Sequence, residues 1–205
     1  MDAVELKQND PSSNSETSPK LIQNSASGNS SAATTPATGR RLPIDRGDLG
    51  IRIAREGTWY YRGSPIGRLS LVKLFASVLR READGRYWLV TPAERGRVEV
   101  EDVPFLAVAL TFEGEGADQR LIFRTNLDEF VTAGPDNPLR VETAANGEPA
   151  PYILVRNGLE ARLARAVFYE LVELGTEQQV GTRTQFGVWS RGAFFSLGES
   201  TPDWG

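Results

Sequence analysis

The sequence predicts an α+β protein of two small domains, each with strands, one helix and further strands. Short runs in which apolar and polar residues alternate, as is typical of strands, recur along most of residues 46–198. Two longer segments instead place apolar residues on one face at the helical period of 3.6 residues. These elements follow one another in a similar order in both halves, which indicates a duplicated motif.

The two ends of the chain differ from the rest in composition. Ser, Thr, Asn, Ala, Gly and Pro dominate the first forty residues, where the large apolar residues after Met1 are Val4, Leu6, Leu21 and Ile22. Such a segment cannot bury enough apolar surface to offset the entropy lost on ordering. We therefore expect a disordered tail at residues 1–45 and a short polar tail at residues 199–205.

The predicted N-terminal domain, residues 46–103, begins with strands at 51–54 and 58–61, separated by a turn at Gly57. A helix is expected next, within residues 68–82, and Gly85 is expected to end the helical region. Its apolar face, at about 100° per residue, would be formed by Leu71, Leu74, Phe75, Val78 and Leu79. Strands at 86–91 and 97–101 complete this domain.

The predicted C-terminal domain, residues 104–198, is β-rich with one helix. Strands are expected at 105–112, 120–125 and 138–143, and a helix is expected from Gly158 to Leu174, closed by Gly175. Two or three strands then follow, interrupted at Gly187 and at the turn 190–192. If the two helices are repeats, Phe75 superposes on Phe168.

Several chemistries are excluded because the chain contains neither Cys nor His. Disulfides, thiol nucleophiles, histidine general bases and zinc sites that use thiolate or imidazole all require one of these residues. A metal ion would have to bind carboxylates and be a hard ion such as Mg²⁺. The sequence does not identify a cofactor, and an enzymatic activity is the least favoured function.

Charge and hydropathy limit the partners. A net charge of −4 and a pI near 5.1 argue against a general nucleic-acid binder. The longest apolar run, residues 104–110, is far shorter than the roughly 20 residues of a membrane span. The first ten residues also lack the pattern of a secretory signal, so we expect a cytoplasmic protein. Arg greatly outnumbers Lys, which reflects either genome composition or bidentate recognition of phosphate or carboxylate.

Three stretches carry a family resemblance: residues 84–108, 123–131 and 151–175. They contain the elements T-P-x-E, V-E-D-x-P-F, T-N and V-R-x-x-L-E-A-R in this order. With this set of motifs the chain resembles the bacterial domain-of-unknown-function family 1285, over about residues 49–198. The resemblance implies a duplicated α+β motif in two domains, the C-terminal one superficially similar to pleckstrin-homology-like folds. It also implies a nucleotide-type ligand at the domain interface and a role in signalling.

One group of candidate site residues lies in the stretch "TPAERGRVEVEDVP". Along its strand, Val98 and Val100 should face one side while charged side chains face the other. Those charges either form cross-strand ion pairs on an exposed face or line a cleft between the domains. The candidates for ligand binding are Thr91, Glu94, Arg97, Glu101 and Asp102.

A second group lies in and before the second predicted helix. Arg156, Arg162 and Arg165 could hold an anion near the helix N-terminus, which is expected at residues 157–158. Glu160 would project into the apolar arc of this helix, a costly position unless the carboxylate is paired. It therefore either meets an arginine from elsewhere, such as Arg156 or Arg68, or borders the cleft and contacts the ligand.

Two functions remain open. The first is a ligand-binding or sensor protein that holds an anionic, nucleotide-type small molecule between its domains. The second is a protein-interaction module with no small-molecule ligand, which binds a partner at a sheet edge or helix groove. On the first hypothesis, Arg156→Ala or Arg162→Ala abolishes the binding of a phosphorylated ligand without unfolding the protein.

Overall fold

The computed structural model describes residues 42–199. Most of the predicted disordered tail and of the short polar tail lies outside the described residues, although the first strand begins at Ile44. The described part contains two α-helices, one short 3-10 helix and fifteen strands in three sheets. The protein is therefore an α+β protein, as the sequence predicts.

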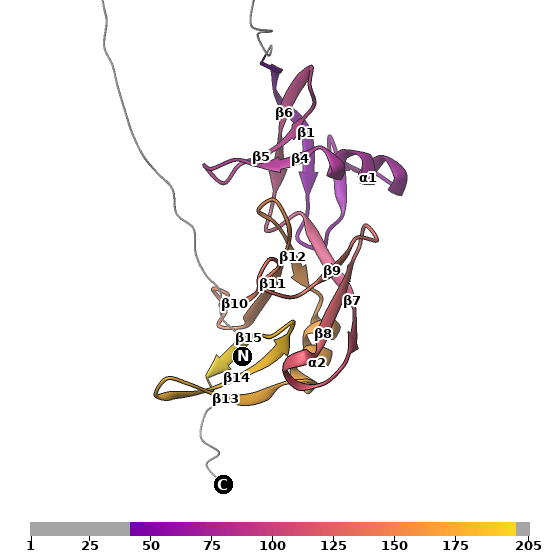
Figure 1. Ribbon diagram of the computed structural model, residues 1–205. Helices are drawn as coiled ribbons and strands as arrows, with labels where there is room; N and C mark the ends of the chain where they lie inside the picture. The colour runs from indigo at the N-terminus through magenta and orange to yellow at the C-terminus, as the bar shows by residue number, and fades with distance from the viewer. Residues whose placement is uncertain (1–41, 200–205) are drawn as a thin grey trace, which may run out of the picture. The chain divides into compact units, whose positions relative to one another are not determined.

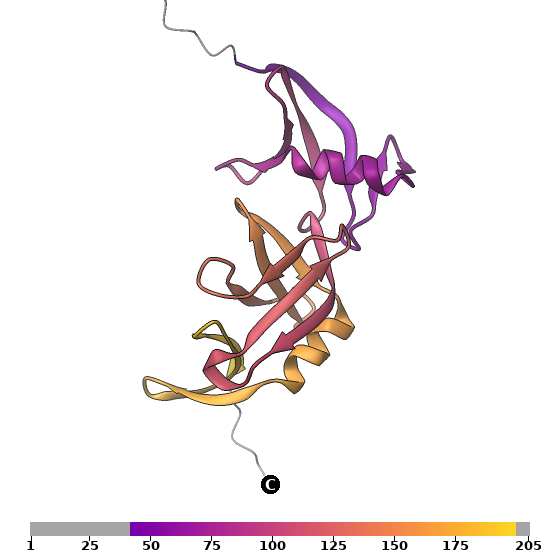
Figure 2. The ribbon, with the colours of Figure 1, turned by 45° about the vertical axis from the view of Figure 1, so that its right-hand side comes forward.

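The N-terminal half forms one six-stranded sheet in the order β3-β2-β1-β6-β5-β4. Its strands are β1 (Ile44–Ile53), β2 (Trp59–Tyr61), β3 (Ser64–Pro65), β4 (Leu79–Arg81), β5 (Tyr87–Val90) and β6 (Glu94–Val100). The two central strands, β1 and β6, run parallel, and the other neighbours are antiparallel. Helix α1 (Leu69–Ser77) connects β3 to β4 and lies across one face of this sheet (Figure 1, Figure 2).

The C-terminal half contains a six-stranded sheet in the order β10-β11-β12-β7-β8-β9 and a three-stranded sheet in the order β13-β14-β15. The larger sheet consists of β7 (Phe105–Glu113), β8 (Arg120–Thr125), β9 (Phe130–Thr132), β10 (Leu139–Thr143), β11 (Pro149–Arg156) and β12 (Leu159–Leu163). Helix α2 (Arg165–Glu173) follows β12, and the smaller sheet consists of β13 (Thr176–Val180), β14 (Arg183–Ser190) and β15 (Ala193–Glu199).

The two six-stranded sheets share one strand order. In each, the first strand pairs in parallel with the sixth, β1 with β6 and β7 with β12, and each set of three strands continues outward from this centre. The helices occupy different places, because α1 follows the third strand of its sheet and α2 follows the sixth. The predicted superposition of Phe75 on Phe168 therefore fails outside the two helices. It places Leu79, which begins β4, on Val172, which lies inside α2.

Both predicted helices are shorter than expected. Residues 159–163, predicted as helix, form strand β12, in which Leu159, Ala161 and Leu163 are buried and the two charged residues between them are half-buried. This alternation has the period of two that a strand requires. Helix α1 ends at Ser77, and the predicted end at Gly85 is instead the turn between β4 and β5, where Gly85 has a φ of 82°.

One apolar core extends through both halves. Trp59, Val72 and Leu79 from the N-terminal half belong to the same buried cluster as Phe105, Phe123, Val167 and Leu171 from the C-terminal half. Burial of each large side chain contributes about 1.5–3 kcal/mol. The described residues accordingly belong to one compact unit. None of the described helices is long and apolar enough to cross a membrane.

Asn126 is one of the residues that join the two halves, and it does so at the predicted turn. Asn126 donates from Nδ2 to the carbonyl of Gly57 at 3.0 Å, and its Oδ1 accepts from the Leu106 N–H at 3.1 Å. Gly57 has a φ of 82°, and a Cβ there would lie 2.6 Å from Asn126 Nδ2. Glycine is therefore required both for the positive φ and for the close approach of Asn126.

Candidate functional site

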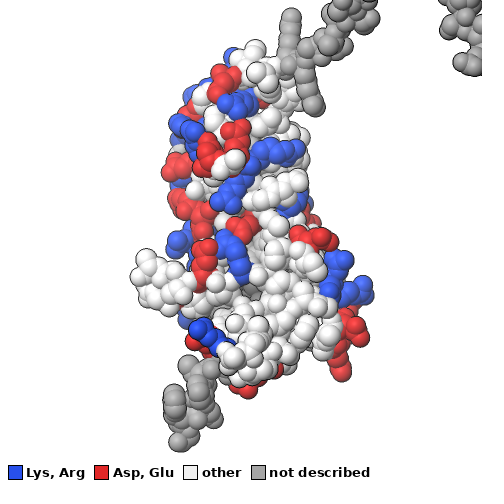
Figure 3. All heavy atoms as spheres, turned by 60° about the vertical axis from the view of Figure 1, so that its left-hand side comes forward, with Lys and Arg blue, Asp and Glu red and all other residues white. Residues whose placement is uncertain are grey.

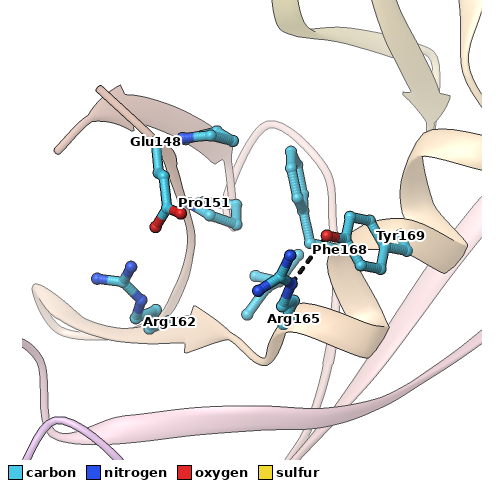
Figure 4. A pocket seen from close by; sticks show the side chains of 8 residues that line it. Glu148, Pro151, Arg162, Arg165, Phe168 and Tyr169 are labelled. Carbon is cyan, nitrogen blue, oxygen red and sulfur yellow. Dashed lines mark hydrogen bonds between the residues drawn. The ribbon is translucent and has the colours of Figure 1, made fainter. Parts of the chain in front are cut away.

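A pocket of about 240 Å³, which we call the C-terminal pocket, lies beside β11, β12 and the first turn of α2. It is lined by Glu148, Pro149, Pro151, Arg162, Leu163, Arg165, Phe168 and Tyr169. Figure 4 shows the Glu148 carboxylate and the two arginines around the same opening, with the two aromatic rings on the side of Arg165. Two of the sequence-predicted site residues, Arg162 and Arg165, thus meet in one pocket.

Arg165 has fewer hydrogen-bond partners than Arg162. Its Nε donates a hydrogen bond to the Tyr169 hydroxyl at 2.8 Å, an interaction that raises the pKa of the guanidinium. Among the described residues, no carboxylate lies within ion-pair distance of Arg165, and its two terminal nitrogens make no hydrogen bond. Arg165 is also the first residue of α2, whose N-terminus has no side-chain cap. The positive end of the helix dipole therefore lies beside the pocket.

Arg162 is bonded to the carboxylate of Asp102, which does not line the pocket. Its Nη1 donates to Asp102 Oδ2 at 2.8 Å and to the Tyr152 hydroxyl at 3.3 Å, and that hydroxyl donates to Asp102 Oδ1 at 3.0 Å. Burial lowers the pKa of Arg162, but the interactions with Asp102 and Tyr152 together outweigh it, so the pKa is raised. Burial also raises the pKa of Tyr152, and the Asp102 carboxylate adds to that rise. Asp102, predicted from the sequence, is thus part of this site through Arg162.

Glu160 is paired, but with neither arginine that the sequence suggested. Arg140 binds it through Nε at 2.6 Å and through Nη2 at 2.9 Å, and it also bonds Glu142. The same guanidinium lies 4.2 Å from the centre of the Tyr152 ring. The hydrogen bond to Glu160 raises the pKa of Arg140. Glu160 therefore has a structural partner and does not line the C-terminal pocket.

Arg156 links the two halves and does not line the C-terminal pocket. Its Nε and Nη2 donate to the two carboxylate oxygens of Glu129, each at 3.0 Å. Nη2 also donates to the carbonyl of Ala76, near the end of α1, at 3.0 Å. The guanidinium of Arg156 is therefore bound to Glu129 and to the Ala76 carbonyl. Unlike Arg162 and Arg165, Arg156 is not part of the lining of the pocket.

A second cavity of about 300 Å³, the N-terminal pocket, lies between α1 and the inner face of its sheet. Apolar side chains dominate it, and its lining is formed by Arg46, Leu49, Ile51, Tyr61, Phe75, Val78, Leu89, Thr91, Glu94, Arg95 and Gly96. Two sequence-predicted residues, Thr91 and Glu94, lie here. Both of its arginines are paired with carboxylates: Arg46 with Glu94 at 2.7 Å, and Arg95 with Glu82 at 2.9 Å and with Asp45 at 3.2 Å.

The last two predicted residues lie on the outer side of the N-terminal sheet or just beyond it. Arg97 pairs with Asp48 at 3.4 Å across the parallel strands. Glu101 pairs with Arg52 and accepts the Arg55 N–H at 3.0 Å, a backbone hydrogen bond that is the main reason for its lowered pKa. Val98 is buried while Arg97 and Glu99 are exposed, so the predicted alternation is confirmed. Figure 3 shows positive and negative side chains interspersed over the upper part of the molecule.

Four important residues of the C-terminal pocket and its surroundings escaped the sequence analysis. Glu148 stands in a turn-forming stretch, and no sequence pattern assigns Phe168 or Tyr169 of the second helix to a binding site. Tyr152 belongs to β11, and the continuous apolar run "YILV" was the available signal for this strand. In the described part of the chain, no group of three Asp, Glu, His or Cys side chains could hold a metal ion.

Two family models match the chain, one for each half. The N-terminal domain of unknown function (DUF1285) matches residues 39–103, and the C-terminal domain of the protein of unknown function (DUF1285) matches residues 104–197. The chain belongs to the DUF1285 family. The resemblance found in the sequence is thereby confirmed, and it extends over both halves.

Two solved structures of DUF1285 family proteins are similar to this chain. One, from Silicibacter pomeroyi DSS-3, is 45% identical with a TM-score of 0.71, covering 77% of this chain and 84% of that one. The other, from Shewanella baltica OS155, is 29% identical with a TM-score of 0.49, covering 61% of this chain and 91% of that one. None of the curated proteins matches the chain.

Proposed function

We propose that this DUF1285 protein is a cytoplasmic binding or sensor protein for a small anionic ligand of the nucleotide type, with a role in signalling. The ligand would occupy the C-terminal pocket. The observation that carries the proposal is the pairing of two arginines with two aromatic rings around one cavity, Arg162 and Arg165 beside Phe168 and Tyr169.

The chemistry of the pocket suits a phosphate group. A guanidinium presents planar N–H donors that match phosphate oxygens bidentately, and Arg165 has its terminal nitrogens free of partners among the described residues. The uncapped N-terminus of α2 adds a favourable field for an anion. The ring of Phe168 and the flat side chains of Pro149 and Pro151 offer apolar contact to a planar group.

Glu148 favours a ligand that also carries hydrogen-bond donors. Its carboxylate lines the same pocket, and its Oε2 accepts a hydrogen bond from Asn146 at 2.9 Å. A carboxylate can accept further hydrogen bonds from ribose hydroxyls or from an amino group of a base. The volume of about 240 Å³ lies slightly below the roughly 300–1,000 Å³ of ordinary ligand pockets, which favours a nucleoside monophosphate or a fragment of it over a larger nucleotide.

The proposed ligand site differs from the one expected from the sequence. The sequence and the family resemblance favour the interface between domains, together with a C-terminal domain that is superficially pleckstrin-homology-like. The proposed pocket is lined by residues of the C-terminal half alone. Its connection to the N-terminal half runs through Asp102, which bonds Arg162.

A thermal-shift screen of nucleotides tests the proposal. A ligand present at 100 times its dissociation constant stabilises the protein by roughly 2.7 kcal/mol, which is easily detected. We expect nucleoside monophosphates to raise the melting temperature of the wild type and to raise that of Arg165→Ala by much less, because this variant should bind them at least tenfold more weakly. A screen without any shift, together with co-purification of a protein partner, would favour the interaction module instead.

A further inference from the structure

One of the arginines that line the C-terminal pocket, Arg162, is already bonded to a carboxylate of the protein, Asp102. Arg162 and Arg165 bring two positive charges, while Glu148 in the lining and Asp102 behind Arg162 bring two negative charges. Without a ligand the four charges therefore balance. An anion that enters the pocket meets an arginine whose strongest hydrogen bond is already made to a carboxylate.

We propose that Asp102 is an affinity-setting residue of this pocket, which neutralises Arg162 until an anionic ligand competes for it. The inference rests on the proposed function and adds to it the regulation of the same site. Asp102 does not line the pocket, so it acts through Arg162 rather than by touching the ligand.

The burial of the pair makes this competition effective. The side chains of Asp102 and Arg162 are only 14% and 20% exposed. Water and salt screen such a pair less than an exposed one, so Asp102 diminishes the positive potential that an anion meets beside Arg162. Only one of the guanidinium nitrogens, Nη1, is used on Asp102 and Tyr152, so the rest of the group can still be offered to a ligand.

Asp102 also connects the pocket to the N-terminal half. Besides Arg162 and Tyr152, it faces Arg55, whose Nε lies 3.8 Å from Oδ2, and the turn that contains Arg55 joins β1 to β2. Asp102 falls in the N-terminal family region, residues 39–103, whereas Arg162 and Tyr152 fall in the C-terminal one. A ligand that draws Arg162 away from Asp102 weakens a contact between the two regions, which is how the binding event would reach the N-terminal half.

The test compares phosphate affinity in four proteins: the wild type, Asp102→Asn, Glu129→Gln and Arg165→Ala. The asparagine side chain keeps the shape of Asp102 and one acceptor oxygen while removing the charge. Glu129→Gln is the matched control, because it removes the charge of another partly buried carboxylate paired with an arginine, here Arg156, outside the pocket. Binding of inorganic phosphate and of adenosine 5′-monophosphate is measured by calorimetry at low salt.

We expect Asp102→Asn to bind both anions at least threefold more tightly than the wild type, and Glu129→Gln to bind them as the wild type does. Unchanged or weaker binding by Asp102→Asn, while the wild type binds and Arg165→Ala binds at least tenfold more weakly, would overturn the role of Asp102 and leave the proposed function standing. No binding by either the wild type or Asp102→Asn would overturn both.

Hydrogen exchange gives an independent readout. With adenosine 5′-monophosphate bound to the wild type, the amides of residues 101–103 and of the turn 54–58 should exchange faster, because Asp102 loses its bond to Arg162. Equal or slower exchange in both segments would contradict the competition even if the affinities followed the prediction.

Discussion

The two pockets of this protein are similar in size but differ in what their arginines do. In the N-terminal pocket, Arg46 and Arg95 are each held by carboxylates, and the lining is mainly apolar. In the C-terminal pocket, Arg165 donates a hydrogen bond to the Tyr169 hydroxyl and is paired with no carboxylate of the described residues, and Arg162 contacts one carboxylate through one nitrogen. The comparison teaches that two cavities can be lined by the same number of arginines and still differ in how many arginine donors are left unpaired for an anion.

Closing the N-terminal pocket should have the largest effect on stability. At Gly96 the side chain of Leu49 lies directly against the backbone of β6, so that a Cβ there would collide with it. Gly96→Ala should therefore push Leu49 into the pocket and lower the free energy of unfolding by about 1–3 kcal/mol, as overpacking does. Urea denaturation measures this loss.

The double variant Leu49→Ala/Gly96→Ala separates overpacking from other effects of the methyl group. In the Leu49→Ala background, the added methyl at position 96 should cost almost nothing, since its collision partner has been removed. An equal cost in both backgrounds would show that the backbone of β6, and not Leu49, resists the substitution. In either case nucleotide binding in the C-terminal pocket should be unchanged.

Arg156→Ala distinguishes a structural arginine from a binding one. It removes two hydrogen bonds to Glu129 and one to the carbonyl of Ala76. We expect the free energy of unfolding to fall by about 1–2 kcal/mol, with unchanged affinity for adenosine 5′-monophosphate. The sequence-based hypothesis instead expects lost binding in a stable protein, so urea denaturation and calorimetry on this one variant decide between the two.

The smallest expected effect concerns an exposed ion pair that belongs to neither pocket. The hydrogen bond from Lys73 to Asp128, with a further contribution from Arg124, lowers the pKa of that carboxyl below its ordinary value of 3.8. A lowered pKa in the folded state means that the stability is present above about pH 4 and is lost as the pH falls through the folded-state pKa. Asp128→Asn should thus lower the urea midpoint slightly at pH 7.

At pH 2.5 the difference between Asp128→Asn and the wild type should shrink. Asparagine suits the backbone at this position, where φ is 60°, so that the substitution tests the charge rather than the turn. A difference in midpoint that is equally large at both pH values would show that the carboxylate acts through something other than its ionised form.

Much of the fold was accessible from the sequence because its strands alternate clearly. The strand through Val98 and Val100, the turn at Gly57 and the strands at 105–112 and 120–125 were all predicted from local patterns. The error at residues 159–163 arose because Leu, Glu, Ala and Arg are good helix formers. Pairing of β12 with β7 and β11 overrode this propensity. The available signal for a strand was the alternation of apolar and charged residues from Leu159 to Leu163, which matches the observed burial.

The candidate site was harder to predict for a physical reason. Arg162 and Arg165 were identified by residue type, but so was Arg156, and the sequence does not show which carboxylates their side chains meet. Glu129, 27 residues before Arg156, accepts hydrogen bonds from two nitrogens of that arginine. Arg140 binds Glu160 after a separation of 20 residues in the chain. Such pairings depend on strand order, which no local pattern contains.

The central claim is that a partly unpaired arginine, Arg165, binds the anionic ligand in the C-terminal pocket. Calorimetric titration of adenosine 5′-monophosphate into the wild type, Arg165→Ala and Arg46→Ala tests it most directly, with the last variant as the control from the N-terminal pocket. We expect the wild type and Arg46→Ala to bind alike and Arg165→Ala to bind at least tenfold more weakly, a loss of about 1.4 kcal/mol. Undiminished binding by Arg165→Ala, or weakened binding by Arg46→Ala alone, would contradict the claim.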